Sequence, residues 1–555
     1  MRVYLDIETN LAHDTIWMCV TKKGDEVLVW RDADNLQEYL NGLVVVAHNG
    51  IGFDFHLLRT LWGIEIADEL QRDTLVISRL YNPELLAPEG TKYKPHSLAA
   101  WGHRLGFPKD DFTDYDGGYS EEMVGYCIND VHVLEKLDLM LEQTMQELKF
   151  SEESIVIEHK VAQICKGMEH NGFALNIEKA QVLLATLSGE MVDIETEFQT
   201  VFPPIITERI SEKTGKKLKD KVTVFNPGSR KQIAERLIAK GVKLTKKTEK
   251  GSFIIDEKVL EGIDLPEAKI FGRYLMIQKR VAAVSSWLDL VGDDGRVHGR
   301  IITNGAVTGR ATHNTPNMGQ VPAVGKPYGA ECRAMFGVAP GMVQVGVDLS
   351  GIELRCLGHY LNDQEWIDEL LKGDIHWFNA QSFGLVAKGT IKDDSNPEHK
   401  TARNRTKTLT YGVLYGAGAT KAGSIVGGNS AQGKRLIDSF VNNTPGLAAL
   451  KIKISKFAKK GHLPGLDGRR VWIRSEHAAL NTLLQSAGAI IAKQWLVECD
   501  KALTEANVPA KLMAWVHDEV QYETAPENAD TLKEIVEKAA TKAGIVLQFR
   551  CPVDA

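Results

Sequence analysis

Two short apolar segments, far apart in the chain, each run into an acidic residue. Met342–Val347 leads to Asp348, and Leu512–Val516 leads to His517-Asp518-Glu519, after which Val520–Tyr522 returns as a strand. We expect the second segment to be a hairpin with the acidic residues at its tip, although polar residues at a turn commonly have no further role. The alternative is a metal site, because two Mg²⁺ ions roughly 4 Å apart need at least two carboxylates from separate elements. Asp348 and Asp518 could supply them if the two segments meet across a sheet.

The residues after Asp348 predict the start of a helix. Ser350 and Glu353 have the Ser-x-x-Glu spacing of a capping box, in which each side chain bonds to a backbone amide at the helix start. Such a cap would also fix the direction of the Glu353 carboxylate.

A basic and aromatic helix is expected between the two acidic segments. In Glu398–Gly412, the side chains of Arg403, Lys407 and Tyr411 are four residues apart and share one helical face. Two cations and an aromatic ring suit a triphosphate with its sugar and base, and a solvated basic face is the alternative. The glycine-rich continuation to Gly418 permits a hinge.

Residues 1 to about 150 alternate short strands with helices, which predicts an α/β domain. The remainder is mostly helical, with Pro- and Gly-containing breaks at residues 200–228 and short strands before Asp348. The expected elements of the first domain are strands at Arg2–Glu8 and Leu43–His48 and helices at Phe53–Trp62 and Ser120–Leu141, the last with Ser120 as N-cap.

Acidic residues recur within this first domain. Asp6 and Glu8 point to the same side of a strand, Asp54 lies at a helix start, and Tyr126 and Asp130 are one turn apart on a helix. Taken singly, they could be a solvated edge, a helix-dipole carboxylate and a structural Tyr–Asp pair. Four carboxylates reaching one point would repel one another without divalent cations.

The bulk properties indicate a multidomain protein without a membrane segment. The 555 residues are too many for one core, so we expect two to four domains. The net charge of −7 does not indicate a nucleic-acid partner, but Arg209–Lys250 is rich in lysine and arginine. The seven cysteines are scattered without a Cys-x-x-Cys pair, which favours a reducing cytoplasm over a disulfide framework.

Three motifs in order resemble those of the DNA polymerase I family, family A. Asp348–Arg355 is similar to its motif A, Arg403–Gly412 to motif B and His517-Asp518-Glu519 to motif C. Further stretches resemble the replicative polymerases of T-seven-type bacteriophages: Tyr274–Arg280, Asn304–His313, Gly373–His376, Asn481–Ala489 and Ala514–Gln521. The resemblance covers nearly the whole chain.

The resemblance implies a right-hand polymerase domain at 151–555, with a helical thumb (about 151–300), an antiparallel palm (about 301–370 and 475–555) and helical fingers (about 371–474). It implies that Asp348 and Asp518 bind two Mg²⁺ ions, with Mn²⁺ as a substitute, and that Glu519 assists. It further implies that the incoming triphosphate binds to His376, Arg403 and Lys407, that its deoxyribose packs against Tyr411, and that the nascent base pair lies beside Tyr415. Glu353 would be the steric gate against a ribose 2′-hydroxyl. The primer–template end would contact Arg310, Gln485 and His517.

The first domain, 1–150, resembles ribonuclease H-like 3′→5′ exonucleases of the DEDDy pattern. The resemblance implies that two further Mg²⁺ ions bind to Asp6, Glu8, Asp54 and Asp130, and that Tyr126 orients the attacking water. The implied activity is primer extension with dNTPs and proofreading during phage DNA replication in the host cytoplasm. The implied partners are primer–template DNA, a helicase-primase and a single-strand binding protein.

Two departures from the phage relatives modify these expectations. The stretch Phe202–Asn226 is short where the relatives carry a thioredoxin-binding insertion, so we expect no thioredoxin clamp. The chain ends at Asp554-Ala555 without the tail that engages the helicase in the relatives. Two rival functions stay open. One is an RNA polymerase of the single-subunit phage type, which Glu353 and the exonuclease disfavour. The other is a nucleic-acid-binding protein with inactive sites, which the complete carboxylate sets disfavour.

Overall fold

A computed structural model describes residues 1–108, 112–248, 250–444 and 446–555. The chain forms two compact units. The first comprises Met1–Asn171, Ile301–Asn314 and Pro340–Ala555, and the second comprises Gly172–Arg300 and Thr315–Ala339. Among the described helices, none has the length and apolar character needed to span a bilayer.

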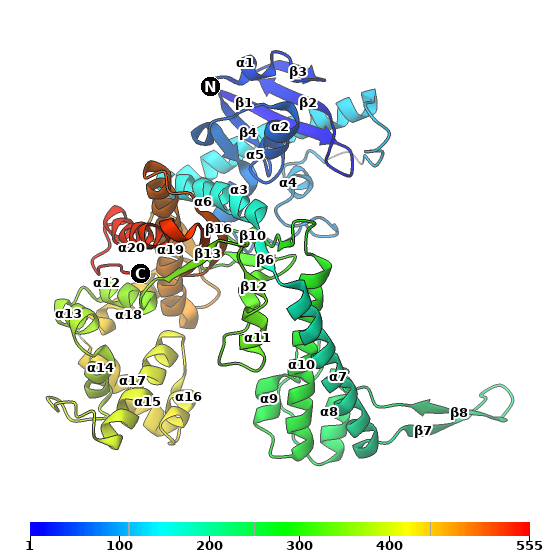
Figure 1. Cartoon of the computed structure of the whole chain (residues 1–555). Coiled ribbons are helices and arrows are strands. Elements are labelled where there is room, and N and C mark those ends of the chain that lie inside the picture. Colours follow the sequence, from blue (N-terminus) through cyan, green and yellow to red (C-terminus); the bar gives the residue numbers. More distant parts are fainter. Residues whose placement is uncertain (109–111, 249, 445) are drawn as a thin grey trace. The chain divides into compact units, whose positions relative to one another are not determined.

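A five-stranded sheet forms the centre of the N-terminal part of the first unit (Figure 1). The strand order is β3-β2-β1-β4-β5, in which β1 is antiparallel to β2 and parallel to β4. Most side chains of β1 are buried, as expected for a strand covered on both faces. The strands are β1 (Arg2–Thr9), β2 (Ile16–Lys23), β3 (Glu26–Trp30), β4 (Val44–Ala47) and β5 (Gln71–Asp73).

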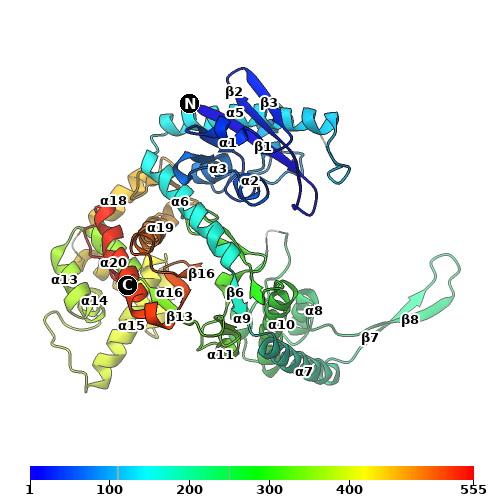
Figure 2. The same ribbon diagram turned by 45° about the horizontal axis from the view of Figure 1, so that its top comes forward.

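Helices cover this sheet, and the longest, α5, runs along it (Figure 2). Ser120 is the N-cap of α5 as predicted, because its side chain accepts a hydrogen bond from the Met123 amide at 3.1 Å. Asp54 is the first residue of α2, also as predicted. The helices are α1 (Leu36–Leu40), α2 (Asp54–Trp62), α3 (Thr74–Tyr81), α4 (Leu98–Arg104) and α5 (Glu121–Glu147), with a 3₁₀ turn at Asp68–Leu70.

A second, three-stranded antiparallel sheet of order β13-β17-β16 lies in the C-terminal part of the first unit. Helix α20 packs against α19 and β13, and α12 packs against α19. The apolar faces of these elements form one large core that includes Trp495, Val520 and Leu357. The elements are β13 (Val343–Asp348), α12 (Ile352–Leu361), α19 (Ala479–Glu505), β16 (Lys511–Val516), β17 (Glu519–Thr524) and α20 (Ala529–Val546).

Helices and short strands complete the first unit. They are α6 (Glu152–Asn171), β11 (Thr312–Asn314), α13 (Gln364–Lys372), α14 (Ile375–Phe383), α15 (Pro397–Leu414), α16 (Ala419–Ile425), α17 (Ser430–Asn443), α18 (Leu447–Ala458), β14 (His462–Pro464) and β15 (Arg470–Trp472). β10 (Arg300–Ile302) pairs with β11, and 3₁₀ turns lie at Glu476–Ala478 and Pro526–Asn528.

The second unit is mainly helical, and α7 packs along α10. Four buried phenylalanines pack against one another in its core, with ring centroids 4.6–6.1 Å apart: Phe198, Phe202, Phe225 and Phe271. Its elements are β6 (Phe173–Leu175), α7 (Ile177–Val201), β7 (Ile205–Ile210), β8 (Lys217–Thr223), α8 (Arg230–Ala239), α9 (Glu257–Glu261), α10 (Pro266–Asp289), β9 (Arg296–Val297), α11 (Gly329–Arg333) and β12 (Phe336–Gly337), with a 3₁₀ turn at Met318–Gln320.

The break predicted at residues 200–228 contains a β-hairpin that the sequence analysis did not predict. Strands β7 and β8 pair antiparallel around a turn in which Gly215 has a φ of 66°. Every residue of β7 is exposed, so the hairpin lacks the buried face that produces an alternating sequence pattern. Three lysines of the predicted basic run, Lys217, Lys219 and Lys221, lie on β8.

A network of four buried charges joins α6 to the C-terminal part of the same unit. Glu158 of α6 accepts hydrogen bonds from Lys493 of α19 and from Arg469, each at 2.5 Å, and Arg469 also pairs with Asp467. All four side chains are at most 3 % exposed. Burial lowers the pKa of Lys493 to about 8, although Glu158 favours its charged form. The network balances two positive and two negative charges away from water, so removing one member is costly.

We predict that Glu158→Gln lowers the free energy of unfolding of this unit by about 3–5 kcal/mol, because it leaves two buried cations with one carboxylate. Chemical denaturation followed by circular dichroism measures the change. The control is Glu142→Gln, which breaks the pair between Arg2 and a side chain that is 35 % exposed and should cost under about 1 kcal/mol. If the two variants lowered the free energy of unfolding equally, the buried network would not stabilise the unit more than an exposed ion pair does.

Candidate active sites

The predicted acidic residues of the C-terminal part lie at one end of the three-stranded sheet. Asp348 is the last residue of β13 and is paired with Glu519, the first residue of β17. The Leu349 amide donates to the Asp518 carbonyl at 2.9 Å, so the β13 end is tied to the turn between β16 and β17. His517 occupies that turn with a φ of 60°. The hairpin with an acidic tip is therefore confirmed.

The carboxylates at this end of the sheet oppose one another electrostatically. The pKa of Asp348 is raised to about 6, first by partial desolvation of its carboxyl group and then by the charges of Asp518, Glu519 and Glu353. Burial also raises the pKa of Asp518, with a contribution from Glu353, whereas Arg310 and His517 act in the opposite direction. A set of oxygen donors with excess negative charge is suited to a hard divalent cation.

Glu353 does not take part in the predicted capping box. The N-cap of α12 is Gly351 in the left-handed conformation (φ 54°), and no side chain caps this helix. The glycine delays the helix start by one residue relative to the prediction, so Ser350 lies outside the cap position. The Glu353 carboxylate instead accepts a hydrogen bond from the Tyr415 hydroxyl at 2.9 Å and lies 3.5 Å from Arg310.

Helix α15 presents the predicted basic face towards α14. Arg403 donates to Asp374, the N-cap of α14, at 2.6 Å, and Lys392 pairs with the same carboxylate at 3.0 Å. These bonds outweigh burial and lower the pKa of Asp374 to about 2. His376 lies within the field of Arg403 and Lys407, which together with burial lowers its pKa.

The aromatic members of the predicted set lie near these groups. The Tyr411 ring is 6.3 Å from that of His376, and burial and the Glu353 charge raise the Tyr411 pKa. Tyr415, which is 44 % exposed, bonds to Glu353. Arg310, His517 and Asp518 line one small cavity with Gly488 and Lys493. Gln485 lies one helical turn before Gly488 on α19 and is half-buried.

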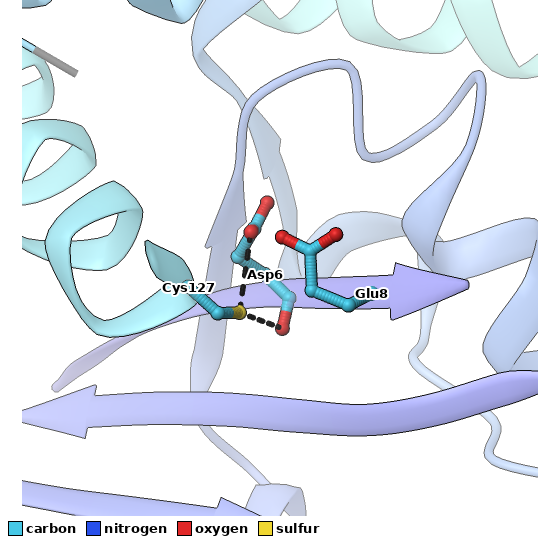
Figure 3. Close-up of side chains that lie close together, drawn as sticks. All are labelled: Asp6, Glu8 and Cys127. Atoms are coloured by element: carbon cyan, nitrogen blue, oxygen red, sulfur yellow. Dashed lines mark hydrogen bonds between the residues drawn. The ribbon is translucent and has the colours of Figure 1, made fainter. Parts of the chain in front are cut away.

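A second acidic group lies on β1 of the N-terminal sheet (Figure 3). Ligand atoms of Asp6, Glu8 and Cys127 lie within 4.8 Å of one another, and this is the one such group of three among the residues that the structure describes. Figure 3 shows the two carboxylates projecting from one side of β1, with the thiol of α5 beside Asp6. The donor atoms of Asp348, Asp518 and Glu519 do not converge as tightly as those of this group.

Three further predicted residues surround this group. The buried Asp54 carboxylate accepts a hydrogen bond from the Ile7 amide at 3.3 Å, and burial together with the Asp6 charge raises its pKa well above the usual value. Tyr126 receives a hydrogen bond from Tyr115 at 3.4 Å. Burial, Asp130 and Glu8 all raise the Tyr126 pKa, so its hydroxyl stays protonated. Asp130 is buried one turn further along α5.

Cys127 is the residue of this group that the sequence analysis missed. Its thiol donates to the Asp6 carboxylate at 3.3 Å, and burial raises its pKa well above the usual value. The protonated thiol is therefore a hydrogen-bond donor that orients Asp6, since only a thiolate is a strong metal ligand. Its position was available from the spacing, because Cys127 follows Met123 and precedes Val131 by four residues on the buried face of α5.

Comparisons with known proteins agree with the motifs. Residues 205–555 match the model of DNA polymerase family A. The chain is 33 % identical to the DNA-directed DNA polymerase of Enterobacteria phage T3 and 34 % identical to that of Escherichia phage T7; each alignment covers 93 % of this chain and 91 % of the relative. DNA polymerase I of Aquifex aeolicus is 27 % identical over 99 % of this chain and 94 % of its own length.

The fold is also that of a solved polymerase. The POL domain of Pol1 from M. smegmatis, in complex with DNA primer-template and dNTP, superimposes with a TM-score of 0.78 at 21 % identity, covering 98 % of this chain and 92 % of that one. The predicted resemblance is thereby confirmed: the chain belongs to DNA polymerase family A, and it is a DNA-directed DNA polymerase similar to those of phages T3 and T7.

Proposed function

We propose that this polymerase extends a DNA primer with dNTPs through two Mg²⁺ ions held by Asp348 and Asp518, and that residues 1–150 are a 3′→5′ proofreading exonuclease. The observation that carries the first part is that separate carboxylates lie at one end of the β13-β17-β16 sheet, where burial and the neighbouring charges raise the pKa of Asp348 to about 6. The similarity to the phage T3 and T7 enzymes supports a role in phage DNA replication.

The donor set of the polymerase site fits divalent cations. Asp348 ends β13, whereas Asp518 lies in the turn between β16 and β17. The charge of Asp518 opposes ionisation of Asp348, and a bound cation would neutralise this repulsion. Glu519 is adjacent, but its carboxylate already accepts a hydrogen bond from Gln521, so we assign it an assisting role. Bound cations would lower the pKa of the primer 3′-hydroxyl and stabilise the leaving pyrophosphate.

The side chains of the chain itself provide the remaining functions of the polymerase site. We assign Arg403, Lys407 and His376 to the triphosphate, because their cationic or donor groups cluster on α15 and α14. Tyr411 would pack against the deoxyribose, and Glu353 would exclude a ribose 2′-hydroxyl.

Tyr415 would lie beside the nascent pair. We assign Arg310, His517 and Gln485 to the primer–template end. The cavity that Arg310 and His517 share with Asp518 supports this assignment.

The exonuclease proposal rests on the group at β1. Asp6, Glu8, Asp54 and Asp130 would hold two Mg²⁺ ions, and the protonated Tyr126 hydroxyl would orient the attacking water. The strand order β3-β2-β1-β4-β5, with β1 parallel to β4 and antiparallel to β2, is consistent with a ribonuclease H-like domain. We also propose that the exposed lysines of β8 contact phosphates of duplex DNA, while a helicase-primase and a single-strand binding protein remain expected partners.

The two proposed activities should separate by mutation. We predict that Asp518→Ala lowers primer extension by at least about 10³-fold, since it removes a metal ligand, and leaves primer degradation intact. Asp6→Ala should do the opposite. Extension and degradation of one labelled primer, measured in parallel with Mg²⁺, test both changes. Loss of both activities in either folded variant would show that the division into two sites is wrong.

Metal binding should be visible in thermal stability. We predict that Asp348→Asn raises the melting temperature of the EDTA-treated protein slightly, by about 1–2 °C, because it removes one of several repelling carboxylates that solvent partly screens. Mg²⁺ should then stabilise the wild type more than the variant, since binding to the folded state stabilises it. Equal stabilisation of both proteins by Mg²⁺ would mean that Asp348 does not bind the ion.

Glu353 should determine the choice of sugar. We predict that Glu353→Ala increases the rate of rNTP incorporation relative to dNTP incorporation by about 10- to 200-fold, the range expected for removing a steric contact of one to three kcal/mol. Single-nucleotide incorporation with dCTP and rCTP measures the ratio. Glu365→Ala, on α13, is the control. An unchanged ratio of rCTP to dCTP incorporation in Glu353→Ala would show that Glu353 does not select the sugar.

A further inference from the structure

The segment 549–555 packs along α12, the helix that follows Asp348. The Phe549 ring stacks on His359 of α12 with centroids 4.6 Å apart and planes 13° apart. Cys551 and Val553 are buried, and the Val553 carbonyl accepts a hydrogen bond from Thr541 of α20 at 3.2 Å. The segment is thus fixed between α12 and α20.

Arg355 ties this segment to the turn that connects Asp348 with α12. Its guanidinium donates to the Ser350 carbonyl at 2.6 Å, to the Pro552 carbonyl, and to the Asp554 carboxylate at 2.9 Å. The Ser350 amide in turn donates to the Asp554 carbonyl at 2.9 Å. The carbonyl of Ser350 is therefore held by the Arg355 guanidinium, and its amide is held by the backbone of the segment 549–555.

The same turn is held from its other side by the second acidic segment. The Leu349 amide donates to the Asp518 carbonyl, and Gly351 takes the left-handed conformation that starts α12. The turn at residues 349–351 is short: Asp348 directly precedes it, and Glu353 is the second residue of the helix that follows it. A shift of Ser350 would therefore move the backbone that carries both carboxylates.

We propose that Arg355, acting through Ser350 and the segment 549–555, is a positioning residue that fixes the placement of Asp348 and Glu353 for nucleotide transfer. The inference rests on the proposed roles of Asp348 and Glu353. Catalytic groups must be held to within about 0.5 Å, and a misplacement of about 1 Å can cost about 10²-fold in rate. The bonds to Leu349 and Ser350 restrain the backbone of the turn from both sides.

The chemistry of Arg355 fits this role better than a purely structural one. Its side chain is 9 % exposed, and a buried charge stabilises a fold no better than a well-packed apolar residue. A planar guanidinium can serve three acceptors in fixed directions, whereas a lysine ammonium on a flexible stem cannot reproduce that fork.

The test measures single-nucleotide incorporation by rapid quench on primed DNA with dCTP and rCTP. Arg355→Met should lower the maximal rate constant by about 10- to 100-fold, while the apparent dCTP affinity changes by less than about threefold. It should also weaken discrimination against rCTP, which a general loss of stability would not do. Arg355→Lys should restore only part of the rate.

The matched control is Arg72→Met. Arg72 lies on β5 of the N-terminal sheet, is similarly buried (12 % exposed) and pairs with Asp138 of α5. This substitution should leave incorporation unchanged. If Arg355→Met does not fold, Asp554→Arg replaces it, since the Asp554 side chain is 57 % exposed and the new cation would repel Arg355. This variant should lower the rate about three- to tenfold.

Asp348→Asn distinguishes a failure of the proposed metal site from a failure of the proposed positioning role of Arg355. If Asp348→Asn retains activity, the proposed metal site is wrong. If Asp348→Asn is inactive while Asp554→Arg and any folded Arg355→Met keep the wild-type rate and rCTP discrimination, the metal site stands and the positioning role of Arg355 is overturned.

Discussion

The antiparallel pairing of β13 with β17 is the constraint on which the polymerase site depends. The register places Asp348 opposite Glu519, and a backbone bond from Leu349 to Asp518 holds the end of β13 against the hairpin turn. The strands belong to distant parts of the chain, and the large core that they share holds them together. A bound cation would relieve the resulting repulsion, and the sheet fixes the backbone that carries Asp348 and Glu519.

Helix α6 links the two acidic sites of the first unit through adjacent side chains. Glu158 bonds to Lys493, which lines the cavity beside Asp518, and His159 accepts a hydrogen bond from the Asp73 amide at 2.8 Å. The Asp73 carboxylate in turn accepts hydrogen bonds from the backbone amides of Asn49 and Ile51, which lie a few residues before Asp54. Both sites are therefore supported from one helix by buried polar contacts, which are costly to leave unsatisfied.

The features that the sequence predicted are those set by local patterns. An apolar strand followed by an aspartate predicted where Asp348 and Asp518 would lie, and Ser120 marked the start of α5 because N-caps depend on neighbouring residues. The capping box at Ser350 was wrong because Gly351 adopted a left-handed conformation that spacing does not reveal. The hairpin at 205–223 has no buried face, and the contacts of Cys127 with Asp6 and of Arg355 with Asp554 join residues far apart in the sequence.

The most direct test of the central claim is the location of bound metal in the polymerase complex. Crystals of the protein with primer–template DNA, a non-hydrolysable dNTP and Mn²⁺ would show the ions by anomalous scattering. The account predicts two Mn²⁺ peaks roughly 4 Å apart, each within about 2.5 Å of an oxygen of Asp348 or Asp518. Peaks that bind the triphosphate but contact neither aspartate would contradict it.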